Sequence, residues 1–245
     1  RVKIAGAYKI YCSDECAKRA RSLWKILRAR NWTEEAYRKQ LKRQKNRCLT
    51  CQKTFIKSPD IDHCHSSKNV RGLLCHNCNA ALGMAKESPE TLRRMIAYLE
   101  YDLTKKYIYL VGALKNPKIP LLGNRLRAEG YDVMDEWWTP GPQADEHWQE
   151  YEKIRGRSYA EALQGRSATN IYLFDRAYLD LADAVVAVLP VGKSAMIELG
   201  YSVGREKPVY FFLDETDPER FDVMPRCVDA VVRTEDELLA TLRSL

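Results

Sequence analysis

The sequence predicts two domains: a small zinc-stabilised α+β domain, followed by a larger α/β domain built on a parallel sheet. Two Cys-x-x-Cys pairs bracket a histidine-rich stretch before residue 80. After residue 106, buried-strand patterns alternate with helical patterns, which is typical of a parallel sheet covered on both faces. The charge divides in the same way. Residues 1–106 carry 24 Lys+Arg and 10 Asp+Glu, a net charge of +14. The whole chain has 40 Lys+Arg and 33 Asp+Glu, so residues 107–245 carry 16 Lys+Arg and 23 Asp+Glu, a net charge of −7.

Composition excludes several classes of protein. No apolar run approaches the roughly 20 residues that span a bilayer, and no signal peptide is visible. Seven of the eight cysteines lie before residue 80, and Cys-x-x-Cys spacing without a secretory signal favours metal binding in a reducing compartment over disulfides. We therefore expect a cytoplasmic protein with no membrane partner. The chain begins at Arg1 rather than Met, which fits truncation or processing upstream.

Residues 1–32 are expected to form a basic helical segment. Cys12 and Cys16 precede a basic run and resemble the second half of a small zinc finger, although two unliganded cysteines at a helix start fit equally well. A basic helix is predicted over residues 18–30. The basic first half fits a polyanion such as nucleic acid, whereas the acidic second half does not.

Residues 33–105 are expected to form the zinc-stabilised domain. Thr33 can cap a helix that ends near Asn46. A hairpin is predicted within 48–74, followed by a helix from about residue 75 that Gly83 interrupts. A second helix is expected to begin at Ser88-Pro89-Glu90, with Leu92, Ile96 and Leu99 on its apolar face. Residues 101–106 are the expected linker to the next domain. Two kinds of ligand are gathered in this domain.

The first kind is a set of four thiols. Cys48, Cys51, Cys75 and Cys78 form two knuckles that suit a tetrahedral ion such as zinc. The second kind consists of hard nitrogen and oxygen groups between or beside the knuckles, namely Asp62, His63, His65 and Asn79. These groups suit a harder cation or acid–base chemistry. The sequence therefore predicts a structural zinc beside a catalytic cluster.

The order of these motifs resembles a known nuclease family. The segments are Cys48-x-x-Cys51, Asp62-His63-Cys64-His65, Val70-Arg71-Gly72-Leu73-Leu74-Cys75-x-x-Cys78-Asn79 and Leu82-Gly83. This arrangement, over about residues 33–103, resembles the recombination endonuclease VII family of the His-Me finger (HNH) nucleases. The resemblance implies a ββα-metal fold, DNA as substrate and zinc on the four cysteines.

The same resemblance implies roles for the hard groups. His63 is the expected general base, and Asp62 and Asn79 are expected to hold one Mg²⁺ or Mn²⁺. His65 could orient phosphate or assist the metal. Arg71 could contact backbone phosphate or equally pin the hairpin. A zinc module that binds DNA without cutting it would need the four cysteines but not His63 or Asn79, and this alternative stays open.

Residues 106–245 are expected to form the α/β domain. Strands are predicted at 107–112, 131–134, 184–189, 209–213 and 230–232, with helices at 121–129, 194–204 and 235–242 and a long, polar helical insertion over 143–170. Alternating strands and helices predict a parallel sheet of Rossmann or flavodoxin-like type.

Scattered residues of this second half resemble the nucleoside 2-deoxyribosyltransferase family and related deoxynucleoside-monophosphate N-glycosidases. They lie in Tyr107–Gly112, at Asp175 and Asp183, and in 192–201. The resemblance implies Glu198 as the nucleophile, Asp175 as the acid that assists the departing base, and Tyr109 as a positioning group. Gly112 and Ser194 are further expected substrate contacts. Many transferases carry a second acid where this chain has Gly192, which favours hydrolysis or nucleotide binding over transfer.

Three readings of the whole protein follow. It is a DNA endonuclease with an appended deoxynucleotide-processing domain, a nuclease regulated by a nucleotide-sensing domain in a phage-defence effector, or a non-cutting zinc module that targets a glycosidase to DNA. Trp137 and Trp138 could stack a base, but core or interface packing is the commoner use of such a pair. Both families commonly form oligomers, so we expect a homo-oligomer in a bacterial or phage-infected cell.

Overall fold

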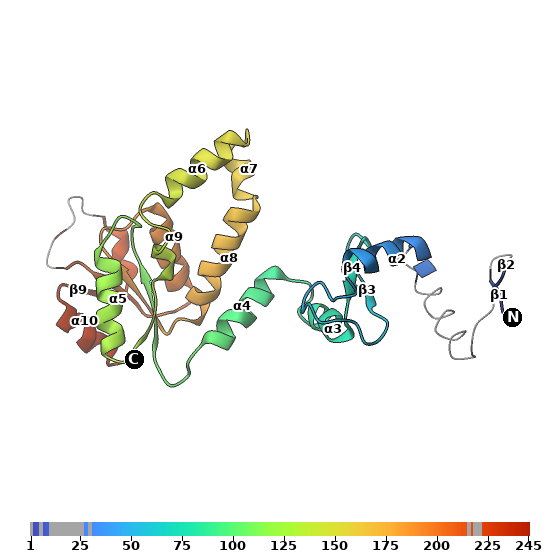
Figure 1. The fold of residues 1–245 in the computed structure, drawn as a ribbon. Coiled ribbons are helices and arrows are strands. Elements are labelled where there is room, and N and C mark those ends of the chain that lie inside the picture. The colour runs from blue at the N-terminus through green and yellow to red at the C-terminus, as the bar shows by residue number, and fades with distance from the viewer. Residues whose placement is uncertain (1, 5–6, 10–26, 29–30, 215–216, 218–221) are drawn as a thin grey trace. The chain divides into compact units, whose positions relative to one another are not determined.

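The computed structural model describes residues 2–4, 7–9, 27–28, 31–214, 217 and 222–245 (Figure 1). Contacts divide the chain into two compact units, Arg1–Ser88 and Pro89–Leu245. The boundary falls just before the helix Pro89–Glu100, which the sequence analysis placed in the zinc-stabilised domain, so this helix belongs to the second unit. The expected partial zinc finger at Cys12 and Cys16 lies outside the described residues, as does most of the expected helix over 18–30.

The first unit contains two strand pairs and two described helices. Its elements are β1 (Val2–Ile4), β2 (Ala7–Lys9), α2 (Glu34–Arg43), β3 (Asp60–His63), β4 (Val70–Leu74) and α3 (His76–Met84). Strands β1 and β2 pair in antiparallel fashion. The predicted cap is confirmed, because the Ala36 backbone N–H donates to Thr33 Oγ1 at 3.0 Å, and α2 begins at the next residue after Thr33.

A buried glutamine joins helix α2 to strand β4. Gln44 Nε2 donates to the Leu73 carbonyl at 2.8 Å, and Gln44 Oε1 accepts from the Leu73 backbone N–H at 2.9 Å. The side chain therefore pairs with β4 much as a neighbouring strand would. Leu73 and Ile61 bury their side chains with Tyr37 of α2 in a small core.

Strands β3 and β4 pair in antiparallel fashion, with a register shift between Asp62 and His63. Helix α3 follows β4 directly, so a hairpin and a helix succeed one another as predicted. The prediction that Gly83 interrupts this helix is wrong: α3 continues to Met84. A single glycine costs a helix only about 1 kcal/mol relative to alanine, which the surrounding structure can offset.

The second unit is built on five parallel strands, and this prediction is confirmed. They are β5 (Tyr107–Val111), β6 (Asp132–Met134), β7 (Ala184–Val188), β8 (Val209–Phe212) and β9 (Ala230–Val232). The spatial order is β6-β5-β7-β8-β9. Counted from the first strand, this is the 2-1-3-4-5 order of flavodoxin-like sheets, whose ligands bind where the strand order reverses, between the first and third strands.

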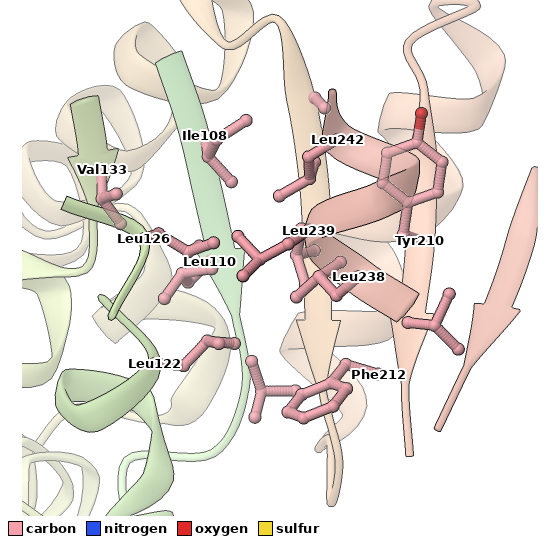
Figure 2. Packing of buried hydrophobic residues seen from close by; sticks show 14 of the residues in the cluster. Ile108, Leu110, Leu122, Leu126, Val133, Tyr210, Phe212, Leu238, Leu239 and Leu242 are labelled. Carbon is pink, nitrogen blue, oxygen red and sulfur yellow. The ribbon is translucent and has the colours of Figure 1, made fainter. Parts of the chain in front are cut away.

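Helices cover both faces of this sheet. On one face, α5 (Lys118–Ala128) and α10 (Glu235–Leu242) pack against alternate residues of the strands, such as Ile108 and Leu110 (Figure 2). On the other face, α8 (Arg166–Leu181) and α9 (Lys193–Gly204) pack against Tyr107 and Tyr109. The central strands are buried throughout, which explains why their sequences are continuously apolar.

Helix α4 (Pro89–Glu100) begins at the predicted proline and packs against α8. Arg94 of α4 donates to Asp180 of α8 at 2.7 Å. The predicted apolar face is wrong in part, because Leu99 is 82% exposed and the buried residue is Ala97. A small side chain and a charged pair, rather than large apolar side chains, thus join this helix to its unit.

The long polar insertion is helical, as predicted. It contains α6 (Ala144–Ile154) and α7 (Tyr159–Leu163) and continues into α8. Ser158 and Glu161 form a reciprocal cap at the start of α7. Within the described residues, no helix is both long enough and apolar enough to cross a membrane.

Candidate functional site

The four predicted cysteine ligands lie together. The Sγ atoms of Cys48, Cys51, Cys75 and Cys78 are all within 4.8 Å of one another, and the Sγ atoms of Cys51 and Cys75 are 3.8 Å apart. Cys48 and Cys51 lie in the turn before the hairpin, whereas Cys75 caps α3 and Cys78 lies in its first turn. The sequence brings the two knuckles together because β4 leads directly into α3.

The electrostatics of this cluster suit a cation. Burial opposes ionisation of Cys48, but backbone hydrogen bonds from Cys51, Cys75 and Thr50 lower the pKa of its thiol to about 6. Burial and the neighbouring thiols raise the pKa of Cys78 to about 12. Four thiolates so close together repel unless a cation compensates them, and a Cys₄ set is a normal structural zinc site. The donor set therefore fits zinc.

A second cluster lies on the hairpin beside this site. Asp62 is buried, and its carboxylate accepts from Arg71 Nε at 2.7 Å and from Arg71 Nη2 at 2.8 Å. Arg71 Nη2 also donates to Glu87 at 2.8 Å. Hydrogen bonding to Asp62, with a smaller contribution from Glu87, raises the pKa of the Arg71 guanidinium. The hairpin is therefore pinned by Arg71, one of the two roles that the sequence left open.

Two histidines adjoin this network. The rings of His63 and His65 lie edge to face with centroids 5.0 Å apart. The His65 backbone N–H donates to Glu87 at 3.1 Å, and this bond, followed by the Arg71 bond, lowers the pKa of the Glu87 carboxyl. His65 is largely exposed. One network of hydrogen bonds and ring contacts thus includes Asp62, His63, His65 and Arg71. Glu87 belongs to it and joins the loop after β3 to the turn after α3.

Asn79 contacts a carboxylate that the sequence analysis did not single out. Its Nδ2 donates to Asp60 at 3.3 Å, and His76 Nδ1 lies 3.1 Å from the same Asp60 oxygen. Asn79 therefore contacts Asp60, and Asp62 contacts Arg71; the joint binding of one magnesium ion by Asp62 and Asn79 stays a prediction. Asp60 lies two residues before Asp62 on β3, a spacing that places both on one face of a regular strand and could have identified it.

Glu87 was missed for a different reason. It follows α3 at a position with φ of +56° and has no motif around it. Only the folded turn brings its carboxylate to Arg71 and to the His65 backbone. Cys64, which lies between His63 and His65 and outside the four-cysteine cluster, bonds to Ser66 at 3.0 Å. Hydrogen bonds from Ser66 and Ser67 lower the pKa of its thiol to about 6.

The second unit brings together three of its predicted residues. Tyr109 of β5, Asp175 of α8 and Glu198 of α9 interact electrostatically on one face of the sheet. Burial raises the pKa of Asp175 to about 6. Burial and, next, the charge of Asp175 raise the pKa of Glu198 to about 8. At neutral pH this pair of half-buried carboxyl groups holds about one proton.

The remaining predicted contacts lie near the ends of β5 and β7. Gly112 follows β5 and packs against Ile119, where a Cβ would approach the Ile119 side chain to 2.6 Å. Ser194 is exposed in the first turn of α9. Asn116, which sequence reasoning missed, is buried and donates to the carbonyls of Val188 and Leu189, joining the loop after β5 to the end of β7.

The tryptophan pair has a structural role. Trp137 Nε1 donates to the Leu110 carbonyl at 2.8 Å, and Trp138 Nε1 donates to the Asn116 carbonyl at 3.1 Å. Both rings pack against the hydrophobic cores of the sheet. The core role that the sequence favoured over base stacking thus matches the contacts of both rings.

Comparisons with known proteins give one family match and two similar phage proteins. Residues 19–101 match the sequence model of recombination endonuclease VII. The chain is also similar to the Gene 59 protein of Mycobacterium phage D29, with 33% identity over 115 residues, which is 45% of this chain and 61% of that protein. It is 34% identical over 86 residues to the Gene 59 protein of Mycobacterium phage L5, covering 34% of this chain and 44% of that protein.

The chain thus spans less than two thirds of the length of each of these relatives. The endonuclease VII match includes the four clustered cysteines and the hairpin with Asp62 and His63. It ends at residue 101, before β5 begins. These comparisons give no support to the deoxyribosyltransferase-like resemblance of the second unit, which rests on its residues alone.

Proposed function

We propose that the protein is a metal-dependent DNA endonuclease whose catalytic residues lie on a zinc-stabilised hairpin and helix of His-Me finger type. The observation that carries this proposal is the endonuclease VII match over a segment with four clustered cysteines next to Asp62 and His63. The four cysteines hold a structural zinc. A domain extending from about residue 33 to 105 contains all of the catalytic groups proposed for the nuclease.

In this proposal His63 acts as the general base. An imidazole with a pKa near ~6.5 can accept a proton from water at neutral pH, and the water then attacks the scissile phosphorus. Glu87 and Arg71 fix the loop and strand on either side of His63, since they hold the His65 backbone and Asp62. His65 is exposed and can reach a phosphate oxygen.

Asp62 and Asn79 are the proposed ligands of Mg²⁺ or Mn²⁺. A bound divalent ion would neutralise charge on the phosphate and on the leaving oxygen. Arg71 uses two of the roughly four lone-pair directions of the Asp62 carboxylate, so Asp62 retains acceptor capacity for a cation. Asn79 keeps its side-chain carbonyl oxygen for the same purpose, because its amide nitrogen makes the bond to Asp60.

A plasmid-nicking assay with Mg²⁺ tests the nuclease. We expect nicking by the wild-type protein and a loss of at least about 100-fold in His63→Ala, since a general base contributes roughly 10²–10⁴-fold. His147→Ala is the matched control, because His147 is an exposed histidine in α6 of the second unit. Full activity in His63→Ala would exclude His63 as the base. Binding of DNA without any nicking by the wild type would favour the non-cutting zinc module.

A second candidate function concerns residues 106–245, which we propose form a nucleoside 2-deoxyribosyltransferase-like domain. The favouring observation is that Tyr109, Asp175 and Glu198 share one site on the sheet. We propose that it acts on a deoxynucleoside or its monophosphate by breaking the N-glycosidic bond. The reactive form would be the less populated one in which Asp175 holds the shared proton: the Glu198 carboxylate then stabilises the sugar's positive charge, and Asp175 protonates the departing base. Gly112 and Ser194 line the proposed substrate site.

Incubation with deoxynucleosides and their monophosphates, followed by chromatography for free base, tests this second activity. We expect base release by the wild type and none by Glu198→Gln, with Glu150→Gln, an exposed carboxylate of α6, as the matched control. No base release, together with nicking that changes when a deoxynucleotide is added, would instead favour a nucleotide sensor. Because the two similar proteins come from phages, we propose that the protein acts in an infected bacterial cell. We also propose that it acts as a homo-oligomer.

A further inference from the structure

A cavity of about 270 Å³ lies within the second unit, under helices α4 and α8. Its floor is formed by the start of β5 and by β6, through Tyr107, Val133 and Met134. Neither Glu198 nor any residue of α9 lines it. The cavity is therefore separate from the proposed nuclease centre in the first unit, and the proposed glycosidic nucleophile is not part of its wall.

Two pairs of aromatic rings form much of the wall. The rings of Tyr101 and Tyr107 lie edge to face, with centroids 6.0 Å apart and an interplanar angle of 84°. The rings of Phe174 and Tyr178 on α8 have centroids 4.8 Å apart and an angle of 56°. Non-parallel rings around a cavity offer both ring faces and ring edges, and ring faces attract cations.

Every ionisable group of the lining other than the tyrosines is acidic. Glu100, Asp132 and Glu136 line the cavity, and no lysine, arginine or histidine does. Tyr178 donates its hydroxyl to Glu100. Glu136 faces Arg127, which lies outside the lining, at 3.6 Å, and is largely exposed. The wall thus carries up to three negative charges with little internal compensation.

The pKa values of two tyrosines of the wall, the buried Tyr107 and the half-buried Tyr178, are raised by burial and by this negative field. Burial, and next the Glu100 carboxylate, raise the pKa of Tyr178 to about 12. Burial, followed by Asp132 and Glu136, raises the pKa of Tyr107. Both tyrosines therefore stay neutral at physiological pH, and they add aromatic surface without adding charge.

We propose that this cavity binds a small organic cation, such as an aliphatic amine. A phosphate-bearing nucleotide would be repelled by the three carboxylates. A hydrated Mg²⁺ ion prefers near-octahedral oxygen ligands and gains nothing from aromatic walls, whereas an alkylammonium ion can use both the ring faces and the carboxylates.

Calorimetric titration of the full chain with putrescine tests the proposal. We expect saturable 1:1 binding that weakens but persists in 0.15 M NaCl, because salt screens the partly exposed carboxylates and leaves the contacts with the aromatic rings in place. Glu136→Gln should weaken it by about tenfold, which corresponds to ~1.4 kcal/mol. Glu136 is a suitable site because its side chain is exposed and glutamine keeps an oxygen that can accept from the Asp135 N–H. Glu150→Gln, outside the cavity, should leave the affinity unchanged.

Phe174→Leu tests the aromatic wall and should weaken binding of putrescine and of choline, with the fold checked by near-ultraviolet circular dichroism. Three results would overturn the proposal. The first is no saturable binding of either amine. The second is equal weakening by Glu136→Gln and Glu150→Gln, which would indicate diffuse attraction to an acidic surface. The third is complete displacement of putrescine by an equal concentration of Mg²⁺.

Discussion

Replacing Glu198 with glutamine should make the second unit more stable, and the gain should depend on pH. Burial and Asp175 raise the pKa of the Glu198 carboxyl from its ordinary value of 4.5 to about 8. A carboxyl whose pKa is raised by folding contributes its stability below pH 4.5, and that contribution is lost as pH rises through about 8. Glutamine carries no charge at any of these pH values, so the variant avoids the loss.

The magnitude follows from the same values. A rise from 4.5 to about 8, at ~1.4 kcal/mol per pKa unit, sets an upper bound of about 5 kcal/mol for the free energy lost above pH 8. Glu198 is only half-buried, so water screens part of this cost. We therefore expect Glu198→Gln to be more stable than wild type by roughly 2 kcal/mol at pH 9, and by little at pH 4.5.

Urea unfolding at pH 4.5, 7 and 9 measures this difference. The fluorescence of Trp137 and Trp138 reports on the second unit, since both rings pack against its core. Glu150→Gln is the control for loss of an exposed carboxylate. The reasoning is refuted if the stability difference between Glu198→Gln and wild type is the same at pH 4.5 and pH 9. Asp175→Asn should reduce the pH dependence, because Asp175 contributes to the raised pKa of Glu198.

The remaining predictions concern the first unit. Cys51→Ser should abolish the zinc detected by elemental analysis and the cooperative melting of this unit, whereas Cys64→Ser should retain both, because only Cys51 belongs to the four-thiol cluster. Gln44→Ala leaves the buried Leu73 N–H without its partner, while the Leu73 carbonyl keeps its bond from the Leu49 N–H, and should cost about 2 kcal/mol in the free energy of unfolding, as measured by denaturant titration. Arg71→Lys should lower the melting temperature, since an ammonium cannot make the two-pronged bond to a carboxylate; an unchanged value would show that the bond contributes little.

The sheet of the second unit could be predicted because its strands leave strong local signals. Tyr107–Val111 and Ala184–Val188 are continuously apolar, as strands buried on both faces must be. The predicted interface of α4 failed for a physical reason. Its apolar positions suggested one buried face, but its buried residue is Ala97, and a charged pair of Arg94 with Asp180 joins it to α8. The periodicity of a helix shows which of its positions are apolar, but not which other element will pack against it.

The same distinction applies to the proposed catalytic cluster. Spacing alone predicted the four-cysteine group, because each knuckle is local and a hairpin brings the two together. Spacing could not reveal Glu87, which reaches Arg71 only through the fold of the turn after α3. Nor could it reveal that Arg71 holds Asp62 through both carboxylate oxygens. A sequence motif identifies the candidate catalytic and metal-binding side chains, whereas the residues that orient them lie elsewhere in the sequence and are found only in the folded structure.

In the proposed nuclease, this orientation would affect how Asp62 binds the proposed divalent ion. Asp62 is buried, and a buried carboxylate without a cationic partner is costly. Arg71 supplies that partner from the facing strand, so the hairpin can fold before any divalent ion arrives. Glu87 gives Arg71 a second acceptor, and a shift of the guanidinium toward Glu87 would expose an Asp62 oxygen. The Asp62–Arg71–Glu87 network can therefore stabilise the folded hairpin while leaving Asp62 able to accept a metal ion.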